Sequence, residues 1–213
     1  MRGGLAGIVL AAGRSARMGP ERNKLVEPVA GRPLVAWPVD ALLEAGIAPV
    51  FVVVGFESDR IRTALRGRPC RFVEHAEWPE GMGSSLARAM RELLAESPLP
   101  EAVLVCVGDL PGLRAADVAR VVDAARREVG EGGAFDPDRI VVPVFDGRRG
   151  HPVCFGARHF AALAQSTGDE GARALLEQNA DRVLRLEIAN EAILRDVDTP
   201  TDLESARKQS DPD

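Results

Sequence analysis

The sequence predicts an α/β protein whose mainly parallel, twisted sheet is covered by helices on both faces, giving three α/β/α layers. Short runs of apolar, often β-branched residues alternate along the chain with segments that repeat apolar residues at helical spacing. These runs are continuous, which is typical of strands buried on both faces. With 213 residues the chain is long enough for one well-buried domain. We expect that domain to span residues 1–209, followed by a frayed tail at 210–213.

The first half of the chain opens with a strand pattern and then alternates helices and strands. An apolar run over residues 5–10 predicts the first strand, and a β-branched run over 50–54 predicts the second. Between them, apolar residues recur on one helical face until Gly46, which is typical of a helix end. The elements expected up to residue 107 are strands at 5–10, 50–54, 70–73 and 102–107 and helices at 34–45, 58–65 and 83–95.

The second half continues the alternation and adds a hairpin pattern. A long amphipathic pattern over residues 115–129 predicts a helix. Two apolar runs, at 140–144 and 152–155, flank Asp146-Gly147, and an Asp-Gly pair between such runs favours a tight β-hairpin. The remaining elements are expected as helices at 158–163, 170–179 and 201–208 and as a strand at 183–188.

The composition argues against several functional classes. The formal net charge is −5 and aromatic residues make up 4%, without any tyrosine, so we expect no nucleic acid as a partner. No stretch approaches the roughly 20 apolar residues that cross a membrane. Cys70, Cys106 and Cys154 lie far apart and are odd in number, which favours buried thiols over disulfides or a zinc site. We therefore expect a cytoplasmic protein without a membrane partner.

A loop rich in glycine, serine and arginine follows the first strand. Glycines let backbone N–H groups approach an anion, and Arg14, Arg17 and Lys24 add positive charge, which suits the phosphates of a nucleoside triphosphate. The spacing is neither G-x-x-x-x-G-K-[ST] nor G-x-G-x-x-G, and an ordinary glycine-rich turn stays open as the alternative. The candidate nucleotide-binding residues here are Leu10, Ala11, Ala12, Gly13, Arg14, Ser15, Gly19 and Lys24.

Two acidic segments follow buried runs. Asp109 comes directly after the strand pattern that ends at residue 107, a position suited to holding Mg²⁺ at the carboxyl edge of a parallel sheet. Asp196 and Asp198 would point to the same side of an extended segment. Both segments have a purely structural alternative. An aspartate before a helix is typical of a helix cap, and Thr199 or Thr201 could cap the last helix, with Pro200 at its first position.

Three further segments could line the same edge. Gly81-Met82-Gly83-Ser84 is a glycine turn into an expected helix, where backbone groups can bind a base or a phosphate, although an N-capped helix start is the simpler interpretation. His151 could bond to an acceptor phosphate, or it could be held by the backbone of a hairpin. Asp169 would otherwise cap a helix, and Arg173 would lie on the solvated face of that helix.

Several of these motifs together resemble one protein family. Leu-Ala-Ala-Gly-x-Ser-x-Arg-Met-Gly at 10–19, followed by Asn23-Lys24-Leu25, resembles the signature of the MobA-like nucleotidyltransferases, and is most similar to their molybdenum cofactor cytidylyltransferase branch. The segment between Met18 and Lys24 is slightly longer than the family's usual spacing. Further resemblances follow in the family's order: Gly-Met-Gly-x-Ser-Leu at 81–86, Gly-Asp-x-Pro at 108–111, Gly-His-Pro at 150–152, Gly-Asp-x-Gly-Ala-Arg at 168–173 and Asp-x-Asp-Thr-Pro-x-Asp-Leu at 196–203.

The resemblance implies a fold of the nucleotide-diphospho-sugar transferase type and a Mg²⁺-dependent enzyme. In the implied reaction, an acceptor phosphate attacks the α-phosphorus of a triphosphate and pyrophosphate leaves. Asp109 and Asp198 would hold Mg²⁺, with Asp196 in reserve for the second position, while Arg17 and Lys24 would neutralise the phosphates. Arg17, Lys24 and Asp109 are thus the expected catalytic residues. Residues 81–84 are expected by the base and ribose, and His151, Asp169 and Arg173 at the acceptor.

The resemblance also implies the substrates, CTP and a molybdopterin-type acceptor, with a molybdoenzyme as a candidate partner. The methyl group of Ala12 leaves less room beside the base than the glycine of the family's guanylyl branch, which favours a compact pyrimidine. Three alternatives stay open. They are a cytidylyltransferase for another phosphorylated or alcohol acceptor, a non-catalytic nucleotide- or cofactor-binding chaperone for a molybdoenzyme, and a dinucleotide oxidoreductase. The missing G-x-G-x-x-G counts against the last.

Overall fold

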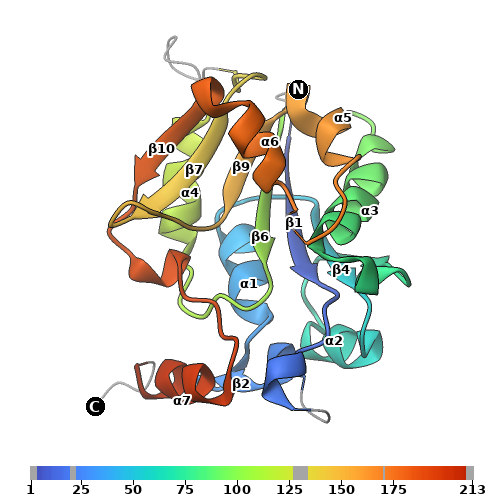
Figure 1. The fold of residues 1–213 in the computed structure, drawn as a ribbon, viewed down its shortest axis with the longest axis vertical. Helices are drawn as coiled ribbons and strands as arrows, with labels where there is room; N and C mark the ends of the chain where they lie inside the picture. The colour runs from blue at the N-terminus through green and yellow to red at the C-terminus, as the bar shows by residue number, and fades with distance from the viewer. Residues whose placement is uncertain (1–3, 20–22, 127–133, 170, 210–213) are drawn as a thin grey trace.

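The structure is a computed structural model that describes residues 4–19, 23–126, 134–169 and 171–209. Its strands are β1 (Leu5–Ala11), β2 (Pro28–Val29), β3 (Arg32–Pro33), β4 (Val50–Val54), β5 (Arg71–Glu74), β6 (Ala102–Val107), β7 (Ile140–Phe145), β8 (Arg148–Arg149), β9 (Val153–Gly156) and β10 (Val183–Glu187). Eight of them form one sheet in the order β10-β7-β9-β6-β1-β4-β5, with β8 paired to β7 (Figure 1). β2 and β3 form a separate small hairpin.

The main path of the sheet is parallel except at one inserted strand. β1 pairs in parallel with β4 on one side and with β6 on the other, and β7 pairs in parallel with β10. β9 lies between β6 and β7 and is antiparallel to both. The prediction of a mainly parallel sheet is therefore confirmed. Because β9 runs opposite to β6, its N-terminal end lies at the edge where β1 and β6 have their C-terminal ends.

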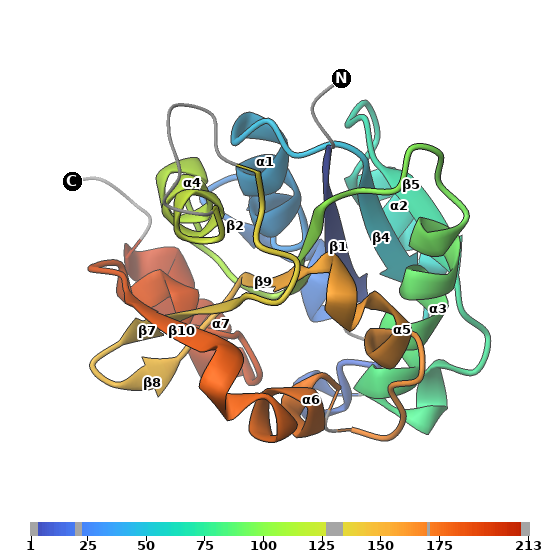
Figure 2. The ribbon, with the colours of Figure 1, turned by 90° about the horizontal axis from the view of Figure 1, so that it is seen from above.

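Helices cover both faces of the sheet, as Figures 1 and 2 show. They are α1 (Ala36–Glu44), α2 (Ser58–Ala64), α3 (Met82–Leu94), α4 (Ala115–Ala124), α5 (Phe160–Leu163), α6 (Arg173–Gln178) and α7 (Pro200–Gln209). One set of strand side chains, including Val9, Val52 and Leu104, packs with α1, α2 and α4. The intervening side chains, including Ile8 and Phe51, face α3 and α5. This confirms the predicted three-layer arrangement.

Several helix ends differ from the predicted ones. The predicted helix at 170–179 begins only at Arg173, because Gly171 has a φ of 54°, which an α-helix does not allow. The predicted helix at 158–163 is a 3₁₀ turn, η4 (Ala157–His159), followed by α5. α4 ends at Ala124, and Arg126 then pairs with Phe135 in an isolated bridge. Residues 127–129 of the predicted helix and the predicted tail at 210–213 lie outside the described residues.

A small apolar cluster connects the two ends of the chain. α7 and the β2–β3 hairpin lie beyond the carboxyl-terminal edge of the sheet (Figure 1). Between them, Met18, Val29, Leu34, Val197 and Leu203 are all buried against one another. This cluster fixes the loop after β1 against the segment that leads into α7. No helix in the described part of the chain has the length and apolar character needed to cross a membrane.

Candidate active site

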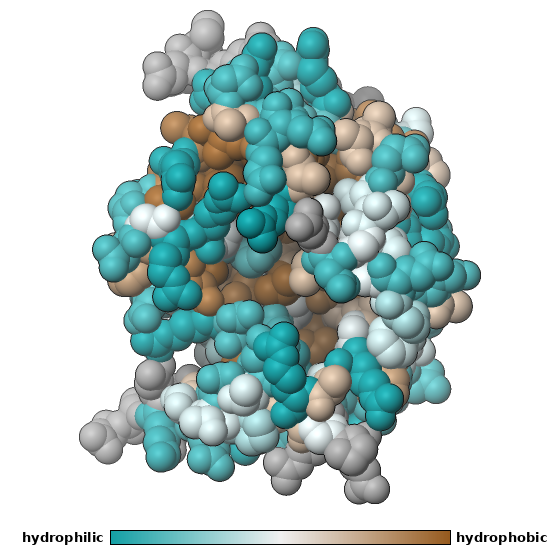
Figure 3. Space-filling view, in the orientation of Figure 1, coloured by the Kyte–Doolittle hydropathy of each residue, from teal (hydrophilic) through white to brown (hydrophobic). Residues whose placement is uncertain are grey.

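A cavity of about 770 Å³ opens at the carboxyl-terminal edge of the sheet, a volume in the range of small-molecule sites. Figure 3 shows a hollow on this face, with a hydrophilic rim and a more hydrophobic floor. The predicted site residues that line the cavity are Leu10, Ala11, Ala12, Gly13, Arg14, Ser15, Arg17, Lys24, Gly81, Met82, Asp109, His151, Asp169, Asp196 and Asp198. The other predicted residues, Gly19, Gly83, Ser84 and Arg173, do not line it.

The loop after β1 supplies one wall of the cavity. It turns through a short 3₁₀ helix, η1 (Ala16–Met18), and Met18 anchors it in the apolar cluster described above. Ser15 is buried, and its Oγ accepts a hydrogen bond of 3.0 Å from the backbone N–H of Lys24. Arg14 and Arg17 are exposed. The loop therefore presents its cations to the cavity, while the bond to Ser15 and the burial of Met18 hold its backbone in place.

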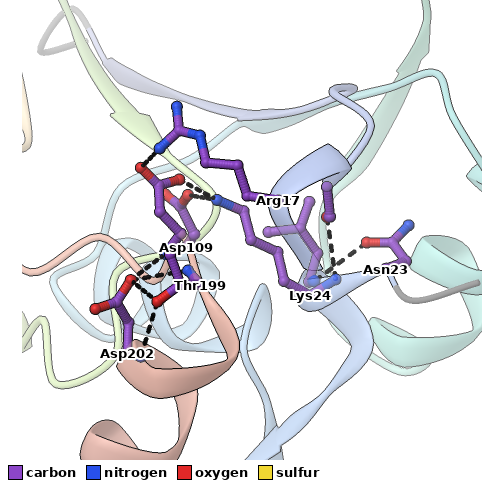
Figure 4. Close-up of polar contacts among 9 residues, drawn as sticks. Arg17, Asn23, Lys24, Asp109, Thr199 and Asp202 are labelled. Atoms are coloured by element: carbon purple, nitrogen blue, oxygen red, sulfur yellow. Dashed lines mark hydrogen bonds and ion pairs between the residues drawn. The ribbon is translucent and has the colours of Figure 1, made fainter. Parts of the chain in front are cut away.

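Lys24 lies between two of the predicted carboxylates (Figure 4). Its Nζ is 2.5 Å from Asp109 Oδ2 and 2.9 Å from Asp198 Oδ1. The guanidinium of Arg17 bonds to the other carboxylate oxygen of Asp198. Four predicted residues from three distant segments thus form one contiguous network, which we call the cation–carboxylate network.

Backbone and capping bonds hold the second acidic segment in place. The N–H of Val197 donates to the carbonyl oxygen of Asp109 at 3.1 Å, so Asp198 is brought beside Asp109. α7 begins directly after Thr199, whose Oγ1 accepts a hydrogen bond from the N–H of Asp202. The Oδ2 of Asp202 in turn accepts bonds from the N–H groups of Thr199 and Asp198, at 2.8 and 3.2 Å. The predicted helix cap is present, and it orients Asp198 at the same time.

The charges in the network stabilise one another. Burial opposes a charged ammonium, but Asp109 and Asp198 outweigh it and raise the pKa of Lys24. Burial likewise opposes ionisation of Asp198, but Lys24 and Arg17 hold its pKa below the usual value. Partial burial and the negative charges of Asp109 and Asp198 raise the pKa of Asp196. Asp196 therefore takes up a proton more readily than Asp198.

The carboxylates are chemically suited to a divalent cation. Asp109 Oδ1 is buried and accepts no hydrogen bond from any described residue. Carboxylate oxygens are ligands that Mg²⁺ and Mn²⁺ prefer. Within the described ranges, no group of three or more His, Cys, Asp or Glu side chains is arranged to hold a metal ion. An ion held here would thus rely on one or two carboxylates and on substrate phosphates, as Mg²⁺ sites commonly do.

The glycine turn before α3 packs directly against the segment around Gly168. The N–H of Gly83 donates to the carbonyl oxygen of Gly168 at 2.7 Å. A Cβ on Gly83 would lie 2.4 Å from the carbonyl oxygen of Thr167, and one on Gly81 would lie 2.5 Å from Asp169 Oδ1. Neither glycine has room for a side chain. Two motifs that are about 85 residues apart therefore form one wall, with Asp169 on its cavity side.

Ser84 supports this glycine turn from behind. Its Oγ donates to the carbonyl oxygen of Gly81 at 2.8 Å and lies 2.8 Å from Nε2 of His75. Burial lowers the pKa of His75, so its imidazole is neutral at pH 7. Trp78, four residues before Met82, lines the cavity itself. Ser84 thus contributes to the shape of the site through the turn.

His151 lies just before β9, at the same edge as the ends of β1 and β6. Its Nδ1 is 3.4 Å from the carbonyl oxygen of Val105, and its backbone N–H donates to Ile193 at 3.0 Å. Burial lowers the pKa of His151, so the imidazole is neutral at pH 7. Arg173 instead pairs with Glu177 on the exposed side of α6, at 3.1 Å. Of the predicted acceptor residues, His151 and Asp169 line the cavity and Arg173 does not.

Two cavity-lining arginines were not predicted as site residues. Arg148 and Arg149 form β8 and line the cavity. The Asp-Gly turn before them is present, and Asp146 and Gly147 have φ values of 50° and 73°, as a type I′ turn requires. In the sequence they follow a turn and precede Gly-His-Pro, so they read as solvent-exposed hairpin residues. The insertion of β9 between β6 and β7, which the sequence did not specify, brings them to the cavity.

Comparison with known proteins places this site in a family. Residues 7–183 match the family described as MobA-like NTP transferase domain. The bifunctional protein GlmU of Anaeromyxobacter dehalogenans is 41% identical over 128 residues, which cover 58% of this chain and 25% of GlmU. The chain thus matches about a quarter of the length of that curated relative. Nicotine blue oxidoreductase of Paenarthrobacter nicotinovorans is 31% identical over 199 residues, covering 92% of each chain.

Solved structures share the whole fold. The Mycobacterium tuberculosis protein Rv0371c has a TM-score of 0.77 at 25% identity and covers 98% of this chain and 99% of its own. A nucleotidyl transferase from Methanothermobacter has a TM-score of 0.80 at 21% identity, with 97% of each chain covered. This likeness confirms the predicted nucleotide-diphospho-sugar transferase fold. The chain therefore belongs to the MobA-like NTP transferase family of enzymes.

Proposed function

We propose that this enzyme is a Mg²⁺-dependent nucleotidyltransferase that acts on CTP and a phosphorylated, molybdopterin-type acceptor. The observation that carries the proposal is the cation–carboxylate network of Arg17, Lys24, Asp109 and Asp198 at one edge of the cavity. A triphosphate needs cations for its phosphates and carboxylates for its metal ion, and this network supplies both in one place.

The reaction needs no covalent intermediate on the protein. An oxygen of the acceptor phosphate forms a bond to the α-phosphorus of CTP, and the bond between the α-phosphorus and the pyrophosphate oxygen breaks. Arg17 and Lys24 bind the outer phosphates and neutralise the pyrophosphate as it leaves, together with backbone N–H groups of residues 12–19. Asp109 and Asp198 would hold Mg²⁺, which when bound would offset the charge of the phosphates.

The nucleotide and the acceptor bind at different ends of the cavity. Ala12, Gly81 and Met82 contact the nucleoside, since they lie beside the start of the phosphate-binding loop and the glycine turn. His151 orients the acceptor through a neutral ring, and Asp169 lines the cavity beside Gly81. Catalysis consists of holding the two substrates in line and of neutralising their charge. The assignment of these roles is supported by the cavity and by the motif order.

Isotope exchange between pyrophosphate and each triphosphate tests the proposal. Exchange requires that the bond at the α-phosphorus be broken and remade, so a nucleotide-binding chaperone gives none. With CTP, Mg²⁺ and a molybdopterin-type acceptor we expect exchange, and we expect Asp109→Ala to lower its rate about a thousandfold. Asp123→Ala, at an exposed position of α4, is the matched control and should leave the rate unchanged. No exchange with any triphosphate across a panel of phosphorylated and alcohol acceptors would overturn the proposal.

A second candidate function is favoured by one relative. Nicotine blue oxidoreductase matches 92% of this chain, so the competing activity is that of a dinucleotide oxidoreductase, the alternative that the sequence left open. Titration with NADH and NADPH, followed by cofactor fluorescence, separates the two. Binding of either dinucleotide in preference to CTP would favour the oxidoreductase.

A cytoplasmic location is supported by Cys70, Cys106 and Cys154, which are all free thiols.

A further inference from the structure

Two arginines line the cavity without a side-chain partner among the described residues. Arg148 and Arg149 are exposed and line the same cavity as His151. Neither guanidinium has a hydrogen bond or ion pair with another described residue. The cations on the opposite wall differ in this respect, because Arg17 and Lys24 are paired with carboxylates and Arg14 lies over the Phe56 ring. Of the four arginines that line the cavity, Arg148 and Arg149 are therefore the two whose guanidinium groups contact no described side chain.

Hydrogen bonds to neighbouring segments hold the backbone of the hairpin that carries these arginines. Arg185 Nη2 donates to the carbonyl oxygen of Gly147 at 2.9 Å, and the N–H of Asp146 donates to Glu187 at 3.1 Å. Beyond the arginines, Gly150 donates to Pro143 at 2.8 Å, and a Cβ on Gly150 would lie 2.7 Å from the carbonyl oxygen of Ile193. The backbone of β8 is thus held by β10, by β7 and by the segment after residue 190. Rigid presentation lowers the entropy cost of binding a ligand.

The topology places β8 at the same edge of the sheet as the triphosphate loop. β10 occupies one edge of β7, so β8 and β9 share the other edge, and β8 continues the line of β9. β9 is separated from β1 by β6 alone, which corresponds to roughly 10 Å across the sheet. An anion bound at β8 therefore lies in the same cavity as the phosphates held by Arg17 and Lys24, at a separate position. A cavity of about 770 Å³ has room for both groups.

We propose that Arg148 and Arg149 form an anion-binding subsite that holds a phosphate group of the acceptor. This inference deepens the proposed function and rests on it. An acceptor phosphate must approach a triphosphate of the same charge, and two guanidinium groups offset that repulsion. Arginine suits this role because its planar fork binds two phosphate oxygens at once. Arg173, which the sequence suggested for the acceptor, is paired with Glu177 outside the cavity.

Calorimetric titration of inorganic phosphate measures this subsite directly. The protein is first saturated with Mg²⁺ and α,β-methylene-CTP, so that the triphosphate position is occupied. We expect wild-type protein to bind phosphate, each of Arg148→Ala and Arg149→Ala to bind it several-fold more weakly, and the double variant at least tenfold more weakly. Arg66→Ala, at an exposed position after α2, is the matched control and should bind phosphate like the wild type.

The arms of the experiment separate the two sources of a phosphate. If the double variant loses affinity for α,β-methylene-CTP but not for inorganic phosphate, the guanidinium groups contact the triphosphate and the subsite is overturned. Equal phosphate affinity in the double variant and the wild type also overturns it, as does a wild type that binds no phosphate.

The same titration distinguishes failure of the subsite from failure of the proposed function. If the wild type binds no triphosphate, the proposed function fails, and phosphate is then titrated into the Arg17→Ala/Lys24→Ala protein without nucleotide. Phosphate binding there that is lost on removal of Arg148 and Arg149 still supports an anion subsite on β8. Phosphate binding that survives their removal overturns it.

Discussion

Lys24 is one of only two lysines in a chain that otherwise uses arginine, and the other, Lys208, is exposed in α7. Arginine presents a broad planar fork, whereas an ammonium is a compact charge that fits between two converging carboxylates. The side chain of Lys24 is 14% exposed and that of Asp109 is 13% exposed, so their attraction is only partly screened by water. The choice of lysine at this position is therefore explained by the geometry of Asp109 and Asp198.

Replacing this lysine should cost stability as well as function. Lys24→Met removes the cationic partner of Asp109 and leaves this carboxylate unpaired in a largely buried position. We therefore expect the free energy of unfolding to fall by about 2 kcal/mol. Urea unfolding of the metal-free protein measures this change. Lys24→Arg should recover it only in part, and Lys208→Met is the matched control that should leave it unchanged. Equal midpoints for Lys24→Met and Lys208→Met would show that the network contributes nothing to folding.

Ala12 should set the preference for the base. Its side chain is buried and its carbonyl oxygen accepts a hydrogen bond from Phe56, so the methyl group is held rigidly at the cavity. We expect CTP to be preferred over GTP by about ten- to two-hundredfold in kcat/KM, and Ala12→Gly to narrow that ratio while keeping CTP use. Ala16→Gly adds a glycine elsewhere in the same loop and should leave the ratio unchanged. A wild-type preference for GTP would contradict the cytidylyl assignment.

At the scale of elements, the wall that α3 forms with the segment at 167–169 depends on Gly81 and Gly83, which have no room for a side chain. Gly83 donates a backbone hydrogen bond to Gly168 at a distance that leaves no space for a methyl group. The sequence showed both motifs, but it could not show that they touch. Their contact explains why a glycine is needed at a helix position, where it otherwise lowers stability.

Gly83→Ala should therefore push the two segments apart. We expect a loss of about 1–3 kcal/mol in the free energy of unfolding, because the added Cβ overlaps backbone atoms of Thr167 that cannot rotate away. We also expect weaker CTP binding, because Asp169 moves with that segment. Denaturant unfolding and CTP titration are the measurements. Gly4→Ala is the matched control: its Cβ would meet only an ordinary contact at 3.8 Å, so stability and CTP binding should both stay unchanged. A Gly83→Ala protein as stable as the wild type would show that Gly83 is not required for this contact.

The sequence predicted an element well where the local spacing of its apolar residues decides how that element packs. The buried runs at 50–54 and 102–107 became β4 and β6 within the predicted bounds, because continuous apolar runs have few other solutions. The cap at Thr199 was visible because capping is decided within four residues. The network around Lys24 was predicted through resemblance, whereas its Lys24–Asp109 and Lys24–Asp198 contacts required the fold.

Features decided by long-range pairing were not visible. The hairpin pattern predicted that β9 runs antiparallel to β7, but nothing in residues 152–155 states that β9 enters between β6 and β7, since that pairing depends on a strand that is distant in sequence. That insertion is what brings Arg148 and Arg149 to the cavity. The β2–β3 hairpin was not predicted, because two-residue strands carry too little pattern to detect.

At the scale of the whole molecule, two cysteines report on the cooperativity of the central sheet. Cys106 in β6 and Cys154 in β9 are buried, and Cys154 pairs in register with Leu104 of β6. Burial raises the pKa of Cys154 to about 12 and raises that of Cys106 further, so reactive thiolate is scarce in the native state. Cys70 lies just before the edge strand β5 and is partly exposed, although burial raises its pKa as well.

Pulse labelling with N-ethylmaleimide at pH 8 across a urea series, read by mass spectrometry, should therefore separate these thiols. We expect Cys70 to be labelled in the native protein, and Cys106 and Cys154 to be labelled together, at the midpoint of global unfolding. Both follow the same transition because β6 and β9 share hydrogen bonds at the centre of one sheet. This outcome is what a single domain over residues 1–209 requires. Labelling of Cys154 at a urea concentration well below that of Cys106 would show that the β7–β9 region opens on its own, and the single-domain prediction would be wrong.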